Sequence, residues 1–204
     1  MLFNFNSPTD IFFGYGYFRK TSEFTNKLGK NPMIVCGRNS MRKFKFLDIL
    51  INDLKKDKKK FFIYDNISSD AKSNEINEAI SIIKKKKIDF VIGLGGGSAI
   101  DAAKAIAVGI NFKNIESIIG KNISDDLKCL PIVAIPTTAG TGSEVSKGSI
   151  ITDIKKNFKS GIRGNNLFPK IAIIDPTFSL TMSDDLLAET GFDAFTHLFE
   201  SYLA

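Results

Sequence analysis

The 204-residue sequence is poor in the features that mark secreted or membrane proteins. It contains two cysteines, Cys36 and Cys129, which are too few for a disulfide scaffold. Its apolar runs are short and interrupted by lysines, so no segment is expected to span a bilayer. Residues 1–4 lack the basic start and the long apolar stretch of a signal peptide. These absences favour a reducing cytoplasm as the setting of the protein.

The net charge of +6 suggests a nucleic-acid-binding module only if the distribution of charge is ignored. Much of the excess lies in two lysine-rich runs, residues 55–60 and 84–87. Both runs fall at the ends of predicted helices, where cations interact favourably with the helix dipole. No aromatic-basic motif accompanies them, so we expect solvated helix ends and no nucleic-acid partner.

Short β-branched and aromatic runs alternate with longer helical patterns along most of the chain. The predicted strands are residues 33–37, 61–65, 90–95, 131–137 and 171–175. The predicted helices between the first four strands are residues 40–57, 73–87 and 98–110. Apolar residues recur at helical spacing in two of these helices, at Phe44, Leu47, Ile51 and Leu54 and at Ile76, Ala79, Ile80 and Ile83. This order predicts an α/β fold with a doubly wound, mostly parallel, Rossmann-like sheet.

The pattern changes after Asp175 and Pro176. Residues 183–204 predict helix with a break near Gly191, and no strand follows. We therefore expect a domain boundary near residue 178. Residues 1–178 would form the α/β domain, and residues 179–204 would form the first helices of an all-α domain.

A glycine-rich loop, Gly95, Gly96 and Gly97 with Ser98, follows the third predicted strand. Glycines permit tight turns and a close approach of an anion to the backbone. Ser98 and Asp101 have the spacing of a capping box, and the N–H groups of a helix start suit a pyrophosphate. The spacing differs from G-x-G-x-x-G and from a Walker A loop, so a turn without a ligand is the alternative.

A second loop, residues 136–145, follows the next predicted strand and is rich in hydroxyls and glycines. Its side chains could hydrogen-bond a nucleotide, and it is expected at the same edge of the sheet as the glycine-rich loop. A surface loop capped by its own hydroxyls is the alternative. Two such loops after neighbouring strands favour a nucleotide site. The polar members of this loop that we predict to bind are Thr137, Thr138, Thr141 and Ser143.

The only histidine, His197, follows Asp193 by four residues, so both project from one face of a helix. Glu200 adds a third polar group near that face. A carboxylate oxygen with an imidazole nitrogen suits Fe(II), Zn(II), Mn(II) or Co(II). The alternative is an ordinary Asp–His pair on a helix surface. Two protein ligands also rarely hold a transition metal firmly.

Together these segments resemble the iron-containing alcohol dehydrogenase family. The resemblance covers essentially the whole chain, and the second and last motifs are its most specific parts. The matching segments are residues 93–98 with Asp101 and Lys104, residues 136–144, residues 175–176 and residues 191–197.

The resemblance implies a metal-dependent oxidoreductase that transfers a hydride between an alcohol and NAD(P). It implies an N-terminal α/β domain that binds the cofactor and a helical C-terminal domain that carries most of the metal site. The family's metal takes one aspartate and three histidines, and Asp193 and His197 match the first two ligands. This chain has no other histidine, so by itself it is expected to hold a catalytic metal poorly. The resemblance also suggests iron ahead of zinc, and a homodimer.

The end of the first predicted strand bears on the choice of cofactor. Family members that prefer NAD often carry an aspartate near the position of Gly37. Arg38, Ser40 and Arg42 follow instead and could pair with a 2′-phosphate, so NADP is expected ahead of NAD. The alternative is that both arginines are ordinary surface charges. The resemblance also places Lys159 near the cofactor.

Two other functions stay open for this sequence. One is a catalytically inactive fragment that binds NAD(P), and the other is a metal-dependent dehydrogenase of the polyol or glycerol type. No residue is assigned as a general acid or base. The predicted metal ligands are Asp193 and His197. The predicted cofactor-binding residues are Gly37, Arg38, Ser40, Gly95, Gly96, Gly97, Ser98, Asp101, Thr137, Thr138, Thr141, Ser143 and Lys159.

Overall fold

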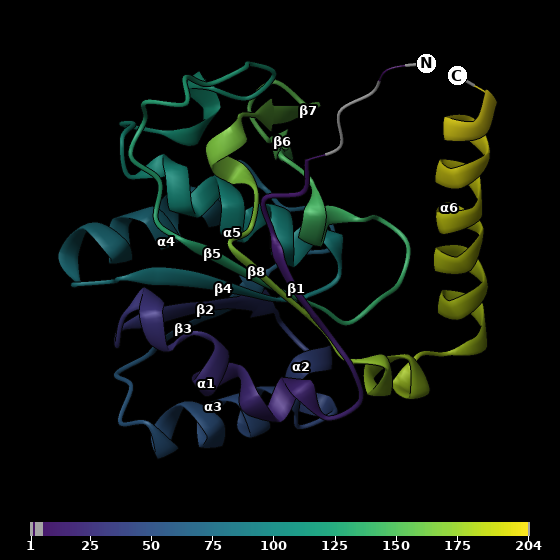
Figure 1. The fold of residues 1–204 in the computed structure, drawn as a ribbon. Helices are drawn as coiled ribbons and strands as arrows, with labels where there is room; N and C mark the ends of the chain where they lie inside the picture. The colour runs from purple at the N-terminus through teal and green to yellow at the C-terminus, as the bar shows by residue number, and fades with distance from the viewer. Residues whose placement is uncertain (1, 3–5, 204) are drawn as a thin grey trace.

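The computed structural model describes residue 2 and residues 6–203 (Figure 1). Most of the N-terminal stretch analysed for a signal peptide and the last residue of the predicted C-terminal helix lie outside the described residues. Within this part of the chain, no helix has the length and apolar character needed to cross a membrane. Both cysteines are free thiols, and burial raises the pKa of each, Cys36 and Cys129, to about 12.

A six-stranded sheet with the order β1-β8-β5-β4-β2-β3 lies at the centre of the fold. All neighbouring strands in it are parallel, which confirms the predicted doubly wound sheet. The chain moves from β2 to β3 on one side and then crosses to β4 on the other, so the winding direction switches between β2 and β4. The strands are β1 (Asp10–Phe13), β2 (Pro32–Gly37), β3 (Phe62–Ile67), β4 (Phe90–Gly95), β5 (Ile132–Pro136) and β8 (Ile171–Ile174).

Helices cover both faces of this sheet (Figure 1). One face carries α1 (Thr21–Phe24), α2 (Ser40–Lys43) and α3 (Phe46–Lys56), and the other carries α4 (Ser73–Lys85) and α5 (Gly97–Gly109). Short 3₁₀ turns connect these elements at η1 (Tyr17–Lys20), η2 (Asn26–Leu28), η3 (Ile115–Ser117), η4 (Ser143–Val145), η5 (Asn165–Leu167) and η6 (Pro176–Thr181).

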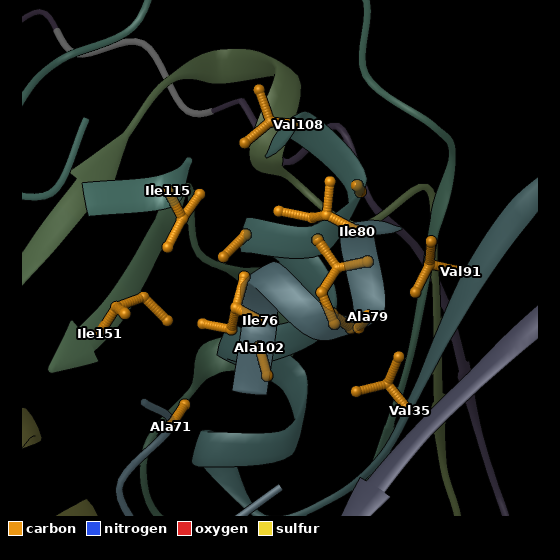
Figure 2. Close-up of a cluster of buried hydrophobic side chains, with 14 of the residues drawn as sticks. Val35, Ala71, Ile76, Ala79, Ile80, Val91, Ala102, Val108, Ile115 and Ile151 are labelled. Atoms are coloured by element: carbon orange, nitrogen blue, oxygen red, sulfur yellow. The ribbon is translucent and has the colours of Figure 1, made fainter. Parts of the chain in front are cut away.

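Alternation along the central strand β4 divides the interior into two apolar cores. Val91 faces α4 and α5 in the core that Figure 2 shows, whereas Phe90 and Ile92 face the core beneath α3. The predicted apolar face of α4 is buried in the first core. A strand buried on both faces explains the continuous apolar run in the sequence.

The single helix predicted for residues 40–57 is wrong in one respect. It is interrupted at Lys45, which adopts a left-handed conformation with φ of 60°. Within α3 the buried apolar residues are Leu47, Leu50 and Leu54, and Ile51 is partly buried against the same core. Phe44 lies outside α3 and is 36% exposed. Phe46 instead packs edge-on against Phe178, with ring centroids 4.6 Å apart.

The lysine-rich runs lie at the C-terminal ends of α3 and α4, as predicted. One of their lysines is not solvated, however. Lys59 is 5% exposed, and its ammonium donates a hydrogen bond to the carbonyl of Gly29 at 3.0 Å. Burial lowers the pKa of Lys59.

A β-hairpin that the sequence patterns did not predict follows the second loop. It consists of β6 (Gly148–Asp153) and β7 (Phe158–Arg163), which pair antiparallel. Ile151 and Ile162 are fully buried and attach the hairpin to the core. The short strand β1 was also not predicted.

The last helix, α6 (Asp184–Leu203), extends beside the sheet rather than over it (Figure 1). It runs through Gly191 without a break, so the predicted break is wrong. A glycine inside a helix costs about 0.5–1 kcal/mol relative to alanine but does not forbid helical geometry. None of the residues of α6 is buried. The predicted domain boundary at residue 178 falls within η6.

Candidate active site at the carboxyl ends of the strands

The two predicted loops emerge side by side from neighbouring strands. Gly95 at the end of β4 is paired in register with Pro136 at the end of β5. The N–H of Thr137 donates to the carbonyl of Gly95 at 3.0 Å, so the two loops begin with a shared hydrogen bond. This edge is where open parallel sheets bind their ligands.

The glycine-rich loop leaves the start of α5 without a side-chain cap. Gly96 is the N-cap residue, and the predicted capping box is wrong. Ser98 donates its hydroxyl to the carbonyl of Ser69, and Asp101 accepts hydrogen bonds from elsewhere in the fold. Across the described chain, no acceptor faces the backbone N–H groups of Gly97 and Ser98. Such N–H groups at a helix start are suited to a phosphate.

Glycine is required by the space between the two loops. A Cβ at Gly97 would lie 2.9 Å from the Cγ2 atom of Thr141, closer than real Cβ contacts. A Cβ at Gly96 would lie 3.3 Å from the hydroxyl of Thr138. Gly95 has φ of 145°, a conformation that L side chains rarely adopt. The loop therefore forms a cradle that a side chain would fill, which fits the phosphates of a dinucleotide.

A cavity of about 550 Å³ lies on one side of this cradle and a second of about 540 Å³ lies on the other. The second lies at the switch between β2 and β4 and is called the adenosine cavity, after the 2′-phosphate end of the cofactor that the sequence predicts there. Its lining includes Gly37 at the end of β2, Arg38 and Ser40 after that strand, and Thr138 from the second loop. The first is called the reaction cavity because it contains Asp193 and His197. Gly97 and Ser98 line both.

The two arginines next to the adenosine cavity are both paired with carboxylates. Arg38 contacts the carboxylate of Glu75 at 3.1 Å, and Glu75 is 4% exposed. The Nε of Arg42 donates to Asp65 at 2.7 Å, and this hydrogen bond raises the pKa of Arg42. The side chain of Arg38 remains 54% exposed, so part of its guanidinium faces solvent.

Asp193 and His197 lie on one face of α6, as their spacing predicted. The Nε2 atom of His197 is 3.5 Å from Oδ1 of Asp193, and the side chains are 60% and 43% exposed respectively. Glu200 does not line the reaction cavity. Among residues 2 and 6–203, no group of three or more His, Cys, Asp or Glu side chains could hold a metal ion. The two donors suit a transition metal chemically, but they do not form a complete site.

Gly140 sets the contact between the second loop and α6. A Cβ at this position would lie 2.8 Å from the carbonyl oxygen of Thr190 and 3.0 Å from Oδ2 of Asp193. The backbone of the loop therefore lies directly against the segment of α6 that carries the Asp–His pair.

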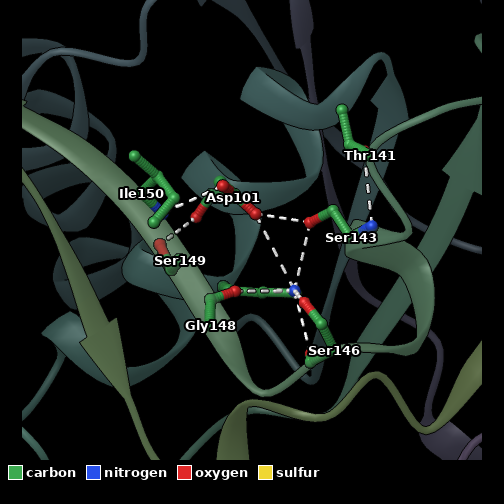
Figure 3. Close-up of polar contacts among 8 residues, drawn as sticks. Asp101, Thr141, Ser143, Ser146, Gly148, Ser149 and Ile150 are labelled. Atoms are coloured by element: carbon green, nitrogen blue, oxygen red, sulfur yellow. Dashed lines mark hydrogen bonds and ion pairs between the residues drawn. The ribbon is translucent and has the colours of Figure 1, made fainter. Parts of the chain in front are cut away.

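A buried polar network that includes Asp101, Ser143 and Ile150 joins α5 to the second loop and to the hairpin (Figure 3). The ammonium of Lys104 is fully buried and donates to the hydroxyl of Ser143 at 3.1 Å and to the carbonyls of Ser146 and Gly148 at 3.0 and 2.8 Å. It lies 3.8 Å from the carboxylate of Asp101. This carboxylate accepts from the hydroxyl of Ser143 and the N–H of Ile150. The network fixes three segments around the reaction cavity.

Burial perturbs both charged members of this network. Burial lowers the pKa of Lys104 to about 8, although the nearby Asp101 favours its charged form. Burial also raises the pKa of Asp101, which Lys104 and the hydrogen bonds partly offset. The motif match had included Lys104, but no position in the network was predicted for it. In a helix that is buried almost all round, the helical spacing of apolar residues gives no sign of how its one lysine is placed.

All of the predicted site residues line adjoining cavities. Lys159 lies in the reaction cavity, where its ammonium pairs with Asp70 at 2.5 Å. Thr137 lies in a third cavity of about 460 Å³, which adjoins the adenosine cavity. Apart from Lys159, the hairpin residues that line the cavity and the two residues just before the hairpin were missed, because no strand had been predicted there. The missed residues of the reaction cavity include Ser146, Lys147, Gly148, Ile150 and Arg163.

Comparison with known proteins gives matches along the whole chain. A family model for iron-containing alcohol dehydrogenase matches residues 8–176. The NADH-dependent butanol dehydrogenase A of Clostridium acetobutylicum is 31% identical over 202 residues, covering 99% of this chain and 52% of that protein. The NADPH-dependent butanol dehydrogenase of Clostridium saccharobutylicum is 32% identical over 206 residues, covering 100% of this chain and 52% of that protein.

A solved structure gives the same result at the level of the fold. The crystal structure of NADH-dependent butanol dehydrogenase A from Thermotoga maritima matches with a TM-score of 0.90 at 32% identity, covering 98% of this chain and 50% of that chain. The chain thus spans about half the length of the curated relatives it matches. The family match, which covers most of the chain, confirms the resemblance seen in its motifs. This chain belongs to the iron-containing alcohol dehydrogenase family.

Proposed function

We propose that this chain binds NAD(P) and forms the cofactor half of an alcohol dehydrogenase that transfers a hydride between the cofactor and a small alcohol or aldehyde. One observation carries the proposal: the side-chain-free cradle at Gly96 and Gly97 exposes two N–H groups without acceptors at the start of α5. In this proposal residues 1–178 form the cofactor domain, and residues 179–204 begin the helical domain.

The cradle divides the cofactor between the two cavities. We assign the pyrophosphate to the N–H groups of Gly97 and Ser98, since these line both cavities. The adenosine end then lies toward Gly37 and the nicotinamide end lies toward the reaction cavity. When bound, the nicotinamide ring supplies the hydride acceptor or donor. The hydroxyls of Thr138 and Thr141 border the cradle and are placed to orient the cofactor.

NADP is proposed ahead of NAD on the charges at the end of β2. Gly37 places no carboxylate there to repel a 2′-phosphate, and a guanidinium has five N–H donors. Arg38 contacts Glu75 through its Nη2 atom, and the other N–H groups of its guanidinium stay available, so it is the proposed partner of the 2′-phosphate. Arg42 contributes less, because Asp65 already neutralises it. The two relatives described above use NADH and NADPH respectively, so this preference rests on the arginines alone.

We propose Asp193 and His197 as two ligands of a divalent metal, with iron ahead of zinc on the family name. A carboxylate and an imidazole are donors that either metal accepts. Two donors alone would bind the metal weakly.

A fluorescence titration of the purified chain with NADPH, with NADH as the comparator, tests the proposal. We expect saturable binding that is tighter for NADPH. Gly97→Ala should weaken binding of both cofactors by about tenfold or more, because the added Cβ collides with Thr141, and a 1.4 kcal/mol loss is tenfold. Gly191→Ala is the matched control, since nothing lies within 4 Å of its added Cβ. Equal affinity of the Gly97→Ala variant and the wild type, with both folded, would refute the assignment of the cradle.

A further inference from the structure

Three cations of the hairpin region line the reaction cavity: Lys147, Lys159 and Arg163. Lys159 is matched by Asp70 at 2.5 Å. The acidic residue Asp101, whose carboxylate accepts from the N–H of Ile150 in the hairpin, is matched by the buried Lys104. Asp193 faces His197. Lys147 and Arg163 are the two cations of this cavity that form no ion pair among the described residues.

Neither of these two side chains has an acidic partner within the described residues. The ammonium of Lys147 has one polar contact, with the amide oxygen of Asn165 at 3.5 Å. Another acidic residue, Asp125, lines a neighbouring cavity with both cations but forms no ion pair with them. Its carboxylate accepts from the backbone N–H and the side-chain amide of Asn165 instead.

The strand register turns the guanidinium of Arg163 toward the reaction cavity. Arg163 is paired with Gly148 across the hairpin, and Gly161 is paired with Ile150. A Cβ at Gly161 would lie 3.4 Å from Cζ of Arg163 and 3.2 Å from the side chain of Ile150. The guanidinium therefore folds back over the bare glycine beside Ile150, which itself lines the cavity.

The position of the pair separates it from the adenosine end of the cleft. Lys147 and Arg163 line the reaction cavity and the polar cavity beside it, and neither lines the adenosine cavity. They share the reaction cavity with Asp193 and His197. A group bound by the pair thus lies in the same cavity as the proposed site of hydride transfer.

From this arrangement we infer that Lys147 and Arg163 select a substrate whose alcohol or aldehyde chain ends in an anionic group, a carboxylate or a sulfonate. This inference rests on the proposed dehydrogenase function and names its substrate class. A planar guanidinium binds two oxygens of such a group at once, and an ammonium adds a point charge. A neutral alcohol such as 1-butanol leaves both cations unmatched.

The test uses hydroxy compounds with NADH, because two reduced partners cannot exchange a hydride and the complex stays intact. Amide NMR shifts of the ¹⁵N-labelled chain are followed during titration with 2-hydroxyethanesulfonate, 3-hydroxypropanoate and 1-butanol, each with and without saturating NADH. We expect the two anions to shift Gly148 and Gly161 and to bind at least about tenfold more tightly than 1-butanol, the scale of a charge-assisted hydrogen bond. The relative affinity of the sulfonate and the carboxylate distinguishes the two anionic groups.

Substitutions assign the effect to the pair. Arg163→Gln and Lys147→Gln should each weaken anion binding by about tenfold and leave NADH affinity unchanged. Lys156→Gln removes an exposed charge from the turn of the same hairpin and should change neither. Equal binding of 1-butanol and the anions, or anion binding retained in Arg163→Gln, would overturn the inference. An equal loss of NADH affinity in Arg163→Gln would also overturn it, since the pair would then serve the cofactor. Failure to bind NADH by a chain that still binds the anions would sink the dehydrogenase proposal alone.

Discussion

The two helices that carry predicted site residues, α5 and α6, differ sharply in how they are packed. Of the 13 residues of α5, 11 are buried, including the charged Asp101 and Lys104. None of the 20 residues of α6 is buried. Its exposed apolar side chains include Leu187, Phe192, Phe195, Leu198, Phe199 and Tyr202.

This difference shows that the two halves of the proposed site have unequal support. The cradle stands on a helix that is held by the sheet, by α4 and by a buried polar network. The Asp–His pair stands on a helix that has few tertiary contacts within the described chain. Most helical stability in proteins comes from packing of an apolar face, so α6 is expected to be the less stable of the two.

The largest expected effect is the loss of the buried cation from α5. Lys104→Met should lower the free energy of unfolding by about 3–5 kcal/mol, because the buried Asp101 is left without its partner. Lys156→Met, in the exposed turn of the hairpin, should stay within about 0.5 kcal/mol of wild type. Urea unfolding measures both. Similar small losses in the two variants would mean that the network does not hold α5.

Apolar truncations should show the same contrast between the helices. Ile106→Ala in α5 should cost about 2–5 kcal/mol, because it opens a cavity in a fully buried position. Leu198→Ala in α6, where the side chain is 73% exposed, should cost less than about 0.5 kcal/mol. Equal losses in thermal or urea unfolding would show that α6 is buried in solution, contrary to its exposure here.

The pH dependence of stability should isolate the lysine of α5. Its pKa is lowered by burial to about 8 when folded, below the ordinary value of an unfolded lysine. Above pH 8 the unfolded lysine binds more protons than the folded one, so the contribution of Lys104 to the free energy of unfolding should rise with pH. The buried thiols of Cys36 and Cys129 oppose this rise in both proteins, because their pKa values are raised on folding. Between pH 8 and 9.5 wild type should therefore gain about 1–2 kcal/mol relative to Lys104→Met. Parallel pH profiles for the two proteins would contradict the lowered pKa.

The smallest expected effect concerns the glycine inside α6. Gly191→Ala should stabilise that helix by about 0.5–1 kcal/mol, because alanine loses less conformational entropy and meets no neighbour. Amide hydrogen exchange should slow in α6 and stay unchanged in α5. Unchanged exchange in α6 would indicate that its opening is not limited by helix propensity.

Sequence patterns predicted the sheet well because its strands are buried on both faces and separated by helices. Strand β4 was predicted with its observed bounds, and the apolar face of α4 was predicted residue by residue. The break at Lys45 was missed because a left-handed lysine has no local signature. At Gly191 the opposite error was made: a break was predicted where the helix continues, because glycine weakens a helix without ending it.

The predicted site was also brought together by chain order, since loops after neighbouring strands meet at one edge. The hairpin was missed because β6 and β7 alternate weakly and their turn is rich in lysine. Arg163 and Lys147 were missed together with the hairpin, because their positions depend on its antiparallel register. The pairing of these two strands is not reflected in a regular alternation of apolar and polar residues along the sequence.

Gly140 lies between the two parts of the proposed site, the glycine cradle and the Asp–His pair on α6. On one side its loop borders the cofactor cradle, and on the other it touches the carbonyl of Thr190 and the carboxylate of Asp193. A methyl group at residue 140 would push the Asp–His pair away from the cradle, and the oxygen and nitrogen atoms of Asp193 and His197 would stay the same. In the proposed site, the size of the side chain at residue 140 would then set the distance between the cofactor and the Asp–His pair. A graded series of side chains at this one position could tune that distance.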